Sequence, residues 1–196
     1  MIIGLAGKSC SGKNQIAEML EFRGFLCIDL DLEVHRLQES MKEILLTNFG
    51  DSILDSHGQI DRRALGQIVF KSPPLLKKLE DLLYPKLDES LNRIICDARP
   101  GAHIILNAAA LQKGEFWKRC DLVIWVSAPW GLRFLRALKR DQRSLLHICR
   151  RFRAQKELKS QFFLSRVDTY IIRNGFTRSV LQKRVDSLIK HLPPER

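Results

Sequence analysis

Five short apolar runs, separated by longer stretches with helical spacing, dominate the hydrophobic pattern of this chain. Strands that are buried on both faces of a sheet show such continuous apolar runs, in contrast to the alternating pattern of half-exposed strands. The runs occupy residues 2–6, 25–28, 102–106, 122–126 and 167–172, and a closing amphipathic helix is expected at 179–191. The alternation of runs and helical stretches predicts an α/β fold with a five-stranded parallel sheet.

The long interval between the second and third runs has no obvious strand. Residues 32–99 show helical spacing in three stretches, at 41–49, 65–70 and 75–95. Turn signals separate the stretches at Asp55-Ser56-His57-Gly58, Ser72-Pro73-Pro74 and Tyr84-Pro85. The interval therefore predicts a helical insertion between the second and third strands.

The first apolar run leads into a phosphate-binding motif. Gly7 and Gly12 enclose four residues, Lys13 follows directly, and helical spacing begins at Gln15. This is the G-x-x-x-x-G-K loop in its strand-loop-helix context. Backbone N–H groups and a helix N-terminus form a concave site for phosphate oxygens, while the lysine reaches the outer phosphates. The alternative is a glycine turn that only joins strand to helix, but motif, position and flanking pattern together favour phosphate binding.

Two positions of this loop depart from the usual pattern. A serine or threonine normally follows the lysine and ligates Mg²⁺ through its hydroxyl group. Here the residue is Asn14, and Gln15 follows where a second hydroxyl is common. An amide oxygen can meet a hard cation directly or through water. Asn14 is therefore the candidate metal ligand.

Two acids, Asp29 and Asp31, follow the second apolar run. In open α/β sheets the carboxyl ends of the strands are where ligands bind, so both acids can face the phosphates held by the first loop. Either could instead cap a helix that begins near Leu32. Residues 107–112, after the third run, form another loop at a carboxyl end.

The positive charge of the chain is concentrated in one segment. The formal net charge is +11, and residues 133–166 alone contain eleven Lys or Arg against two acids. Such a run is usually a solvated face, but a basic face can also bind a nucleotide, nucleic acid or a membrane surface. Because opposing acids are nearly absent, the pattern favours anion binding. The residues that share one helical face through three- and four-residue steps are Arg133, Arg136, Lys139, Arg140 and Arg143.

Cysteine usage and the lack of long apolar runs point to the cytoplasm. The five cysteines are scattered, with no C-x-x-C pair and no histidine at metal-ligand spacing, so neither a zinc site nor a disulfide framework is expected. No apolar run approaches the ~20 residues that a membrane span needs. We therefore expect a cytoplasmic protein.

Several sequence blocks, taken in order, resemble the dephospho-coenzyme A kinase family over most of the chain. Residues 24–31, G-F-L-C-I-D-L-D, are similar to the family's G-x-x-V-I-D-A-D segment. Residues 58–70 are similar to G-x-L-x-R-x-x-L-G-x-x-V-F, the most family-specific match. The other matching blocks are the opening at 4–13, the lid arginines at 133–140, the R-x-x-x-Q signature at Arg151 and Gln155, and the A-D-x-V-I-x-N-x-G ending at 168–175.

The resemblance implies a P-loop NTPase fold of three layers, with a helical substrate-binding insertion and a basic helical lid. Residues 1–31, 100–129 and 167–196 would form the nucleotide-binding core. Residues 32–99 would form the insertion for the acceptor, and residues 130–166 the lid.

The resemblance also implies a reaction, the transfer of the γ-phosphoryl group of ATP to the ribose 3′-hydroxyl of dephospho-coenzyme A. Asp31 would accept the hydroxyl proton, Arg140 would meet the charge that develops on the transferred group, and Mg²⁺ would assist. The acceptor would contact Asp31, Arg62, Arg63 and Tyr84. The nucleotide site would comprise Gly7, Cys10, Ser11, Gly12, Lys13, Asn14, Gln15 and Asn174.

Departures from the family pattern leave other functions open. Besides the loop changes, Tyr84 replaces a histidine before proline, and residues 108–112 read A-A-A-L-Q where the family has P-L-L-x-E. The alternatives are another small-molecule P-loop kinase and a degenerate member that binds without catalysing. We expect ATP and dephospho-coenzyme A as partners, no nucleic acid or membrane, and a monomer or weak homo-oligomer.

Overall fold

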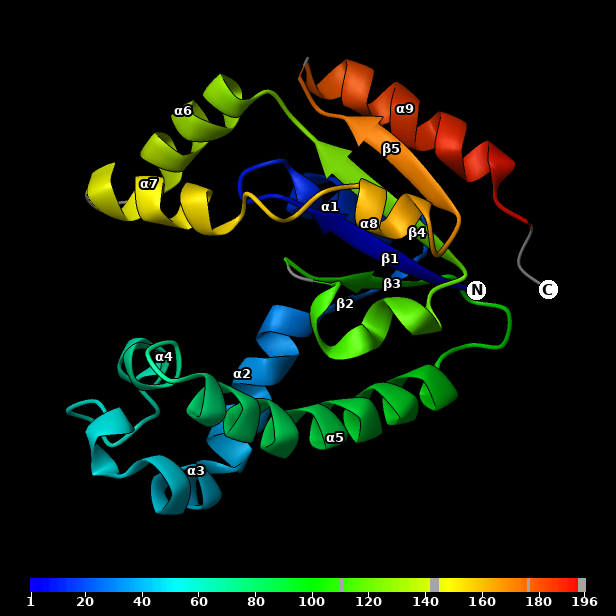
Figure 1. Cartoon of the computed structure of the whole chain (residues 1–196). Coiled ribbons are helices and arrows are strands. Elements are labelled where there is room, and N and C mark those ends of the chain that lie inside the picture. Colours follow the sequence, from blue (N-terminus) through cyan, green and yellow to red (C-terminus); the bar gives the residue numbers. More distant parts are fainter. Residues whose placement is uncertain (110, 142–144, 176, 194–196) are drawn as a thin grey trace. The chain divides into compact units, whose positions relative to one another are not determined.

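Figure 1 shows the computed structural model of the protein, which describes residues 1–109, 111–141, 145–175 and 177–193. The chain divides into two compact units. The first contains Met1–Asp29 and Arg99–Arg196, and the second is the continuous segment Leu30–Ala98.

The first unit is built on a five-stranded parallel sheet with the order β2-β3-β1-β4-β5. Each strand overlaps one predicted apolar run, with ends shifted by at most two residues, so the predicted α/β fold and sheet are confirmed. The strands are β1 (Ile2–Gly7), β2 (Leu26–Asp29), β3 (Ile104–Asn107), β4 (Leu122–Ser127) and β5 (Thr169–Arg173).

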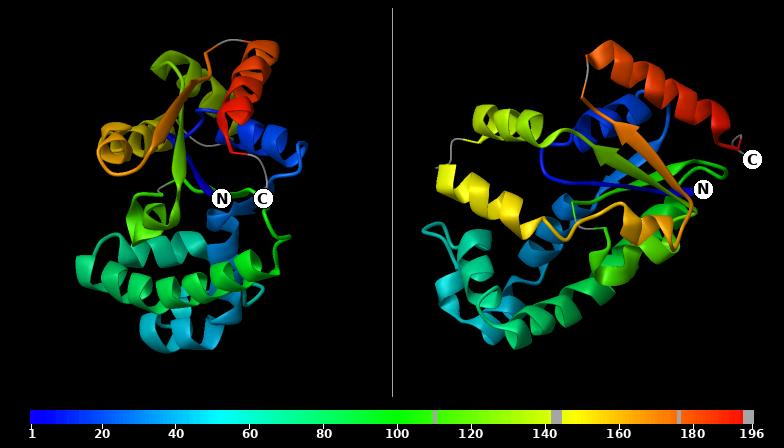
Figure 2. Two further views of the ribbon diagram at one scale, coloured as in Figure 1. Left: turned by 90° about the vertical axis from the view of Figure 1, so that its right-hand side faces the viewer. Right: turned by 45° about the horizontal axis from the view of Figure 1, so that its top comes forward.

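Helices cover both faces of this sheet. On one face α1 (Lys13–Glu21) and α9 (Arg178–His191) lie side by side and bury a cluster that includes Leu5, Ile105 and Ile124 (Figures 1 and 2). Trp125 points the other way, as strand alternation requires. It is 7% exposed and packs against Phe163 of α8 (Gln161–Leu164), so it is a core residue.

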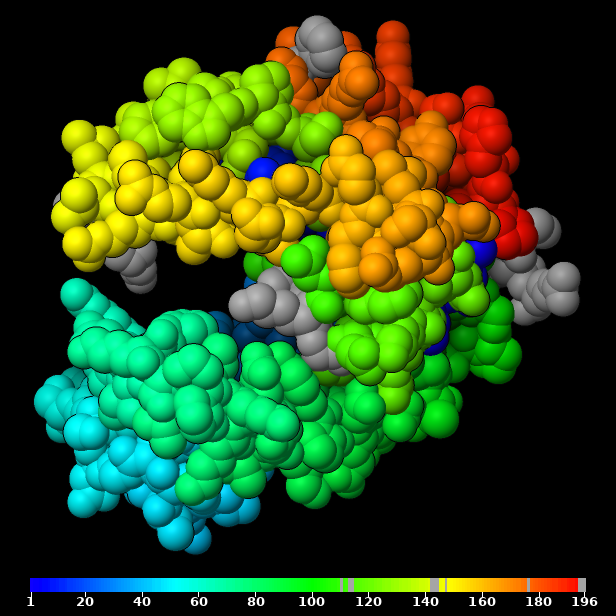
Figure 3. Space-filling model, in the orientation of Figure 1, coloured from blue at the N-terminus to red at the C-terminus, as the bar shows by residue number. Residues whose placement is uncertain are grey.

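Three further elements complete the first unit. They are η2 (Lys113–Arg119), which precedes β4, and α6 (Trp130–Arg140) and α7 (Leu145–Ala154), which follow it. Helices α6 and α7 pack against each other through Ala137, Ile148 and Phe152, and Cys10 of the N-terminal loop packs on the same cluster. In Figure 3 some blue atoms of the N-terminal residues are visible between these two helices.

The second unit is helical, apart from a single antiparallel bridge between Leu54 and Ile60. Its core is a cluster of aliphatic side chains that includes Leu45, Ile53 and Leu65. Asp61 caps α4 by accepting hydrogen bonds from the N–H groups of Arg63 and Ala64, at 2.8 and 3.2 Å. The elements are α2 (Leu30–Ser40), α3 (Lys42–Phe49), η1 (Asp51–Ile53), α4 (Arg62–Val69) and α5 (Pro73–Asp97).

The turn predicted at Tyr84-Pro85 is wrong, because Pro85 lies inside α5. A proline in a helix interior costs about 3 kcal/mol, since it removes a backbone hydrogen bond and its ring meets the preceding turn. Leucines at four-residue spacing continue through this point and are all buried, at 79, 83, 87 and 91. Each fully buried leucine contributes roughly 1.5–3 kcal/mol, so burial of this face outweighs the cost of the proline.

No helix in the described part of the chain is long and apolar enough to cross a membrane.

Candidate nucleotide-binding site

The G-x-x-x-x-G-K loop joins β1 to α1, as the motif predicts. Gly12 has a φ of 97°, and a Cβ atom there would collide with the side-chain amide of Asn174. A Cβ atom on Gly7 would meet the backbone carbonyl oxygen of Val126. Both positions therefore require glycine, because the loop passes too close to its neighbours for any side chain.

Lys13 folds back over the loop that precedes it. Its Nζ atom donates to the carbonyl oxygen of Gly7 at 3.2 Å, and the N–H group of Ser11 donates to the carbonyl oxygen of Lys8 at 3.1 Å. Cys10 adopts a φ of 59°, a left-handed conformation that is uncommon outside glycine. The loop is thus tightly curled, with the lysine ammonium group above it.

Two arginines of α6 hold this loop. The Nε atom of Arg133 donates to the carbonyl oxygen of Ser9 at 2.9 Å, and Nη1 of Arg136 donates to that of Cys10 at 3.4 Å. Arg133 is 6% exposed and its guanidinium group stacks over the ring of Phe152. Burial lowers the pKa of Arg133. These two residues face the loop, not solvent, whereas Lys139 and Arg140 are exposed; Arg143 lies outside the described residues.

Gln155, which follows α7, contacts the same loop. Its Oε1 atom accepts a hydrogen bond from the N–H group of Ser9 at 2.8 Å. The glutamine of the predicted R-x-x-x-Q signature is therefore bound to the phosphate loop across 146 residues of sequence.

Asn174 holds the loop from the end of β5. Its Nδ2 atom donates to the carbonyl oxygen of Ser11 at 2.9 Å and to Oε1 of Gln15 at 3.3 Å. Its Oδ1 atom accepts from Nη2 of Arg136 at 3.3 Å, and the residue is only 2% exposed. The side chain of Asn174 is therefore fully engaged within the loop and its surroundings, and its predicted contact with the nucleotide stays a prediction.

A pocket of about 180 Å³ lies between α1 and the strand ends of β2 and β3. Asp29 and Asn107 end these two strands and are paired in register. Nδ2 of Asn107 approaches Oδ1 of Asn14 at 3.5 Å. The sequence indicated Asp29 and Asn14 as site residues but not Asn107, whose only signal was its position at a carboxyl end. The pocket is lined by Asn14, Ala17, Glu18, Glu21, Cys27, Asp29 and Asn107.

This combination of loop, basic helix and strand-end carboxylate is the arrangement of a P-loop kinase. A sequence model of the dephospho-CoA kinase family matches residues 1–187. The chain belongs to the dephospho-CoA kinase family. The resemblance of its sequence blocks is thereby confirmed, and so is the class of enzyme, a kinase that takes phosphate from ATP.

A named relative and two solved structures are similar to this chain. A dephospho-CoA kinase of Treponema denticola is 36% identical in an alignment 200 positions long, which includes 97% of this chain and 89% of the relative. The crystal structure of TT1252 from Thermus thermophilus has a TM-score of 0.85 at 26% identity, with 98% of both chains covered. Dephospho-CoA kinase from Campylobacter jejuni shares the fold, with a TM-score of 0.68 at 21% identity over 96% of this chain and 95% of that one.

The segment at residues 108–112, which differs from the family pattern, contains two buried side chains. Ala108 and Leu111 are buried, and Leu111 lies so close to Gly4 of β1 that a Cβ atom there would meet it at 2.5 Å. Ala110 lies outside the described residues. Gln112 precedes η2, at the end of this segment.

Arg140, to which the family resemblance gives a catalytic role, ends α6 and pairs with Asp141. Its Nε atom donates to Oδ1 of Asp141 at 2.9 Å, and Arg151 of α7 contacts the other carboxylate oxygen. Burial alone would raise the pKa of Asp141, but the hydrogen bonds from Arg140 and Arg151 outweigh it and hold this pKa below 3.8. Asp141 therefore links α6 to α7 as an ionised group. The catalytic role of Arg140 stays a prediction.

The ion pairs of Asp141 predict a pH-dependent contribution to stability. A pKa that is lowered in the folded state stabilises the fold above the unfolded-state pKa, and this contribution is lost as the pH falls through the folded-state value. Asp141→Asn should thus lower the free energy of unfolding by about 1 kcal/mol at pH 7 and by much less near pH 2. Urea unfolding at both pH values measures this, with Asp81→Asn at an exposed position as the control. Equal losses at the two pH values would contradict the prediction.

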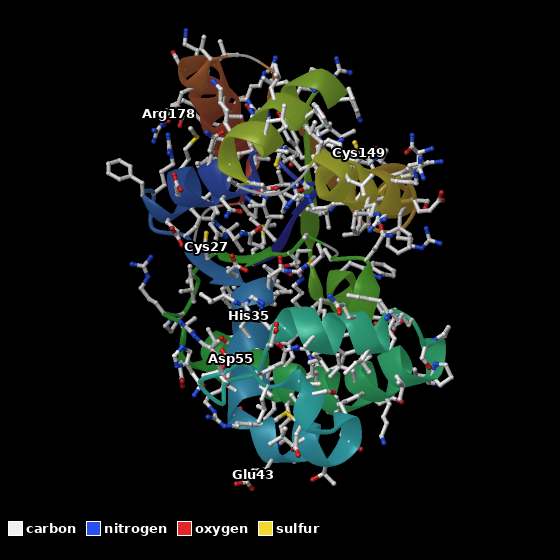
Figure 4. All side chains as sticks on the ribbon, turned by 90° about the vertical axis from the view of Figure 1, so that its left-hand side faces the viewer. Cys27, His35, Glu43, Asp55, Cys149 and Arg178 are labelled. Atoms are coloured by element: carbon white, nitrogen blue, oxygen red, sulfur yellow. The ribbon has the colours of Figure 1, made fainter. Side chains whose placement is uncertain are left out.

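The residues predicted to bind the acceptor lie on three helices of the second unit. Arg62 and Arg63 are in the first turn of α4, and Arg62 contacts the imidazole ring of His35 on α2, which is labelled in Figure 4. No sequence motif selected His35. Tyr84 of α5 is half-buried, and burial, followed by the carboxylate of Glu80, raises its pKa to about 12.

Asp31 lies in the first turn of α2 and is exposed. Because this helix begins at Leu30, the interpretation of Asp31 as the cap of a helix starting near Leu32 is wrong. Asp29, as the last residue of β2, stands directly before the helix. A carboxylate in the first turn interacts favourably with the helix dipole, so Asp31 stabilises α2 whether or not it has a catalytic role.

Proposed function

We propose that this protein is a dephospho-CoA kinase that transfers the γ-phosphoryl group of ATP to the ribose 3′-hydroxyl of dephospho-CoA. The observation that carries the proposal is the G-x-x-x-x-G-K loop, folded between β1 and α1 in a family member whose match spans residues 1–187. The block at 58–70, which includes α4 and its capping residue Asp61, supports the same acceptor because it is the most family-specific match in the chain.

The loop and the basic residues around it supply most of the interactions with the nucleotide. Phosphoryl transfer needs little covalent chemistry from the protein, which mainly positions the groups and neutralises charge. Burial lowers the pKa of Lys8, and the positive charges of Arg133 and Lys159 lower it further. The positive charges of these two residues lie near the loop, and positive charge there favours polyphosphate binding. Lys13 would hold the outer phosphates.

Mg²⁺ fits the residues at the end of the loop. Oxygen ligands are what this cation prefers, and it usually retains several waters beside one or two protein groups and the phosphates. Asn14, Asn107 and the carboxylate of Asp29 line one pocket, and Oδ1 of Asn107 is buried there without a hydrogen-bond partner among the described residues. Asn14 and Asp29 would hold the ion, directly or through water, with Asn107 beside Asn14. When bound, Mg²⁺ neutralises charge on the phosphate oxygens.

Asp31 is our candidate for the general base. Its carboxylate would accept the proton of the acceptor hydroxyl, while Arg62, Arg63 and Tyr84 would seat the acceptor. What supports these roles is the match of residues 24–31 and 58–70 to the family blocks.

Residues 130–166 would act as a lid over bound ATP and not as a nucleic-acid-binding surface. A segment with nine excess positive charges between residues 133 and 166 repels itself until phosphates neutralise it. ATP should therefore slow tryptic cleavage within this segment, measured by mass spectrometry of the fragments. Cleavage at exposed Lys190 of α9 serves as the internal control. Salt-dependent binding to random duplex DNA without protection by ATP would contradict the lid role.

A coupled ATP assay over a panel of acceptors tests the proposed function. Dephospho-CoA should be phosphorylated, and adenosine, shikimate and other small alcohols should not. Faster transfer to another alcohol would assign the protein to a different small-molecule kinase activity. ATP binding without transfer to any acceptor would indicate a member that has kept only the binding function.

A further inference from the structure

The two amides that replace hydroxyl groups in the phosphate loop each face an asparagine at the end of a strand. Asn14 lies beside Asn107 of β3, and Gln15 accepts a hydrogen bond from Asn174 after β5. The departures from the usual loop are therefore matched by partners of the same chemistry. Asn107 is not part of any of the family blocks, so its role must be inferred from its contacts.

The position of Asn107 follows from the sheet. As the last residue of β3, it is in register with Leu5 of β1 and Asp29 of β2. Alternation along the strand puts its side chain on the same face as Ile105, which belongs to the core under α1. Cys27 of β2 faces α1 as well, since its thiol group contacts the carbonyl oxygen of Ala17 (Figure 4). Asn107 thus points toward the first turn of α1, where Asn14 lies.

Of the two polar side-chain atoms of Asn107, Nδ2 forms a hydrogen bond and Oδ1 has no partner among the described residues. The residue is 6% exposed, and its Nδ2 atom donates a long hydrogen bond of 3.5 Å to Oδ1 of Asn14. Its own Oδ1 atom is buried, and no residue of the described chain donates to it. Leaving such an oxygen without a hydrogen bond is destabilising, so water or a ligand is expected to complete the site.

The hydrogen bond fixes the direction of the Asn14 amide. An amide presents an acceptor oxygen on one side and a donor NH₂ group on the other, and only the oxygen can meet a cation. Nδ2 of Asn107 attracts the oxygen of Asn14 and would repel its NH₂ group. Since a carbonyl oxygen has two lone pairs, the second remains available for a cation.

Carboxylate ligands alone do not provide a metal site in this structure. In the described ranges, no group of three or more His, Cys, Asp or Glu side chains is arranged to hold a metal ion. Mg²⁺ usually takes only one or two protein oxygen ligands beside waters and phosphates, and the amide oxygen of Asn14 can be one of them. The orientation of Asn14 consequently matters more here than in a loop with a hydroxyl group, which rotates freely to suit the ion.

We propose that Asn107 is a positioning residue, which turns the amide oxygen of Asn14 toward the Mg²⁺ ion that accompanies ATP. The proposal rests on the nucleotide-binding function proposed above and names no new step in the reaction. Asn107 acts through Asn14, whereas Asn174 holds the loop itself through Ser11 and Gln15. Replacement of Asn107 should therefore weaken ATP binding only when Mg²⁺ is present, whereas replacement of Asn174 should weaken it with or without the metal.

The decisive measurement is the affinity for a non-hydrolysable ATP analogue, by calorimetry, in Mg²⁺ and in EDTA. Hydrogen-bond partners of metal-holding groups typically contribute about 10–100-fold to metal affinity. Asn107→Leu should reduce the gain in affinity that Mg²⁺ gives by roughly this factor and leave the affinity in EDTA unchanged. Asn174→Ala, the matched comparison, should weaken binding equally in both conditions. An undiminished Mg²⁺ gain in Asn107→Leu would overturn the proposal.

A double-variant cycle separates positioning from mere packing. A threonine hydroxyl needs no partner to orient it, so in an Asn14→Thr background the Asn107→Leu change should have little further effect on the Mg²⁺ gain. The same loss in both backgrounds would mean that Asn107 has only a structural role. Asn107→Ala provides a second variant if leucine impairs folding, and urea unfolding checks both. Because no acceptor is present, the result holds whether or not dephospho-CoA proves to be the substrate.

Discussion

Replacement of Lys13 by alanine should abolish measurable ATP binding and turnover. The ammonium group is the mobile cation of the loop, and its Nζ atom already lies over the loop, 3.2 Å from the carbonyl oxygen of Gly7. At an effective dielectric constant of about 20, two unit charges 4 Å apart interact by roughly 4 kcal/mol. Even half of that energy corresponds to about a 30-fold loss of affinity, and the multiple charges of the phosphates increase it.

Calorimetric titration with ATP and the coupled assay measure this effect directly. The control is Lys190→Ala, which removes the same charge from an exposed position on α9. That variant should bind ATP normally, so net charge alone would not explain the loss. Unchanged ATP affinity in Lys13→Ala would refute the assignment of the loop.

Asp31→Asn should reduce turnover by about 10²- to 10⁴-fold, which is the usual contribution of a general base. Asparagine has nearly the same shape as aspartate but cannot accept the proton of the acceptor hydroxyl. ATP affinity should remain nearly intact, because Lys13 and the loop amides are unchanged. The measurements are the turnover rate at saturating substrates and the Kd of ATP.

A structural role for Asp31 would give a different result. The first-turn position in α2 is worth only about 0.3–1 kcal/mol through the helix dipole, so the loss would appear in stability and leave turnover nearly normal. Asp29→Asn is the matched variant at the other acid of the segment. A large loss of turnover in Asp29→Asn alone would transfer the role of base to Asp29.

The parts of the fold that the sequence predicts well are those in which local pattern and burial agree. Strand β1 and the loop after it combine an apolar run, two glycines and a lysine in fixed order, so both element and chemistry follow from a short stretch. Pro85 shows the opposite case, because its local signal is a turn while the leucines on either side continue one buried helical face. The residues next to Pro85 do not show how many leucines of this helix are buried, and that burial decides that the helix continues.

The contacts that complete the candidate site depend on register and topology, which no local pattern encodes. Asn107 reaches Asn14 because β3 pairs with β1 at one particular register. Gln155 reaches Ser9 because the segment after α7 returns to the N-terminal loop. Arg133 was predicted on a basic helical face, yet its near-complete burial follows only from the position of that face against the loop.

The place of β1 at the centre of the sheet has a consequence for how the protein folds. β1 is synthesised well before its two partner strands, since Ile2 pairs with Ile104 and Ile3 with Leu122. Pairing of such distant segments must overcome a large loss of chain entropy before any contact is gained, and it is correspondingly slow. The segment Leu30–Ala98 is continuous and has its own core, so it can assemble during translation while β1 still lacks a neighbour. The phosphate loop, although synthesised before these partner strands, is thus among the last parts to take shape.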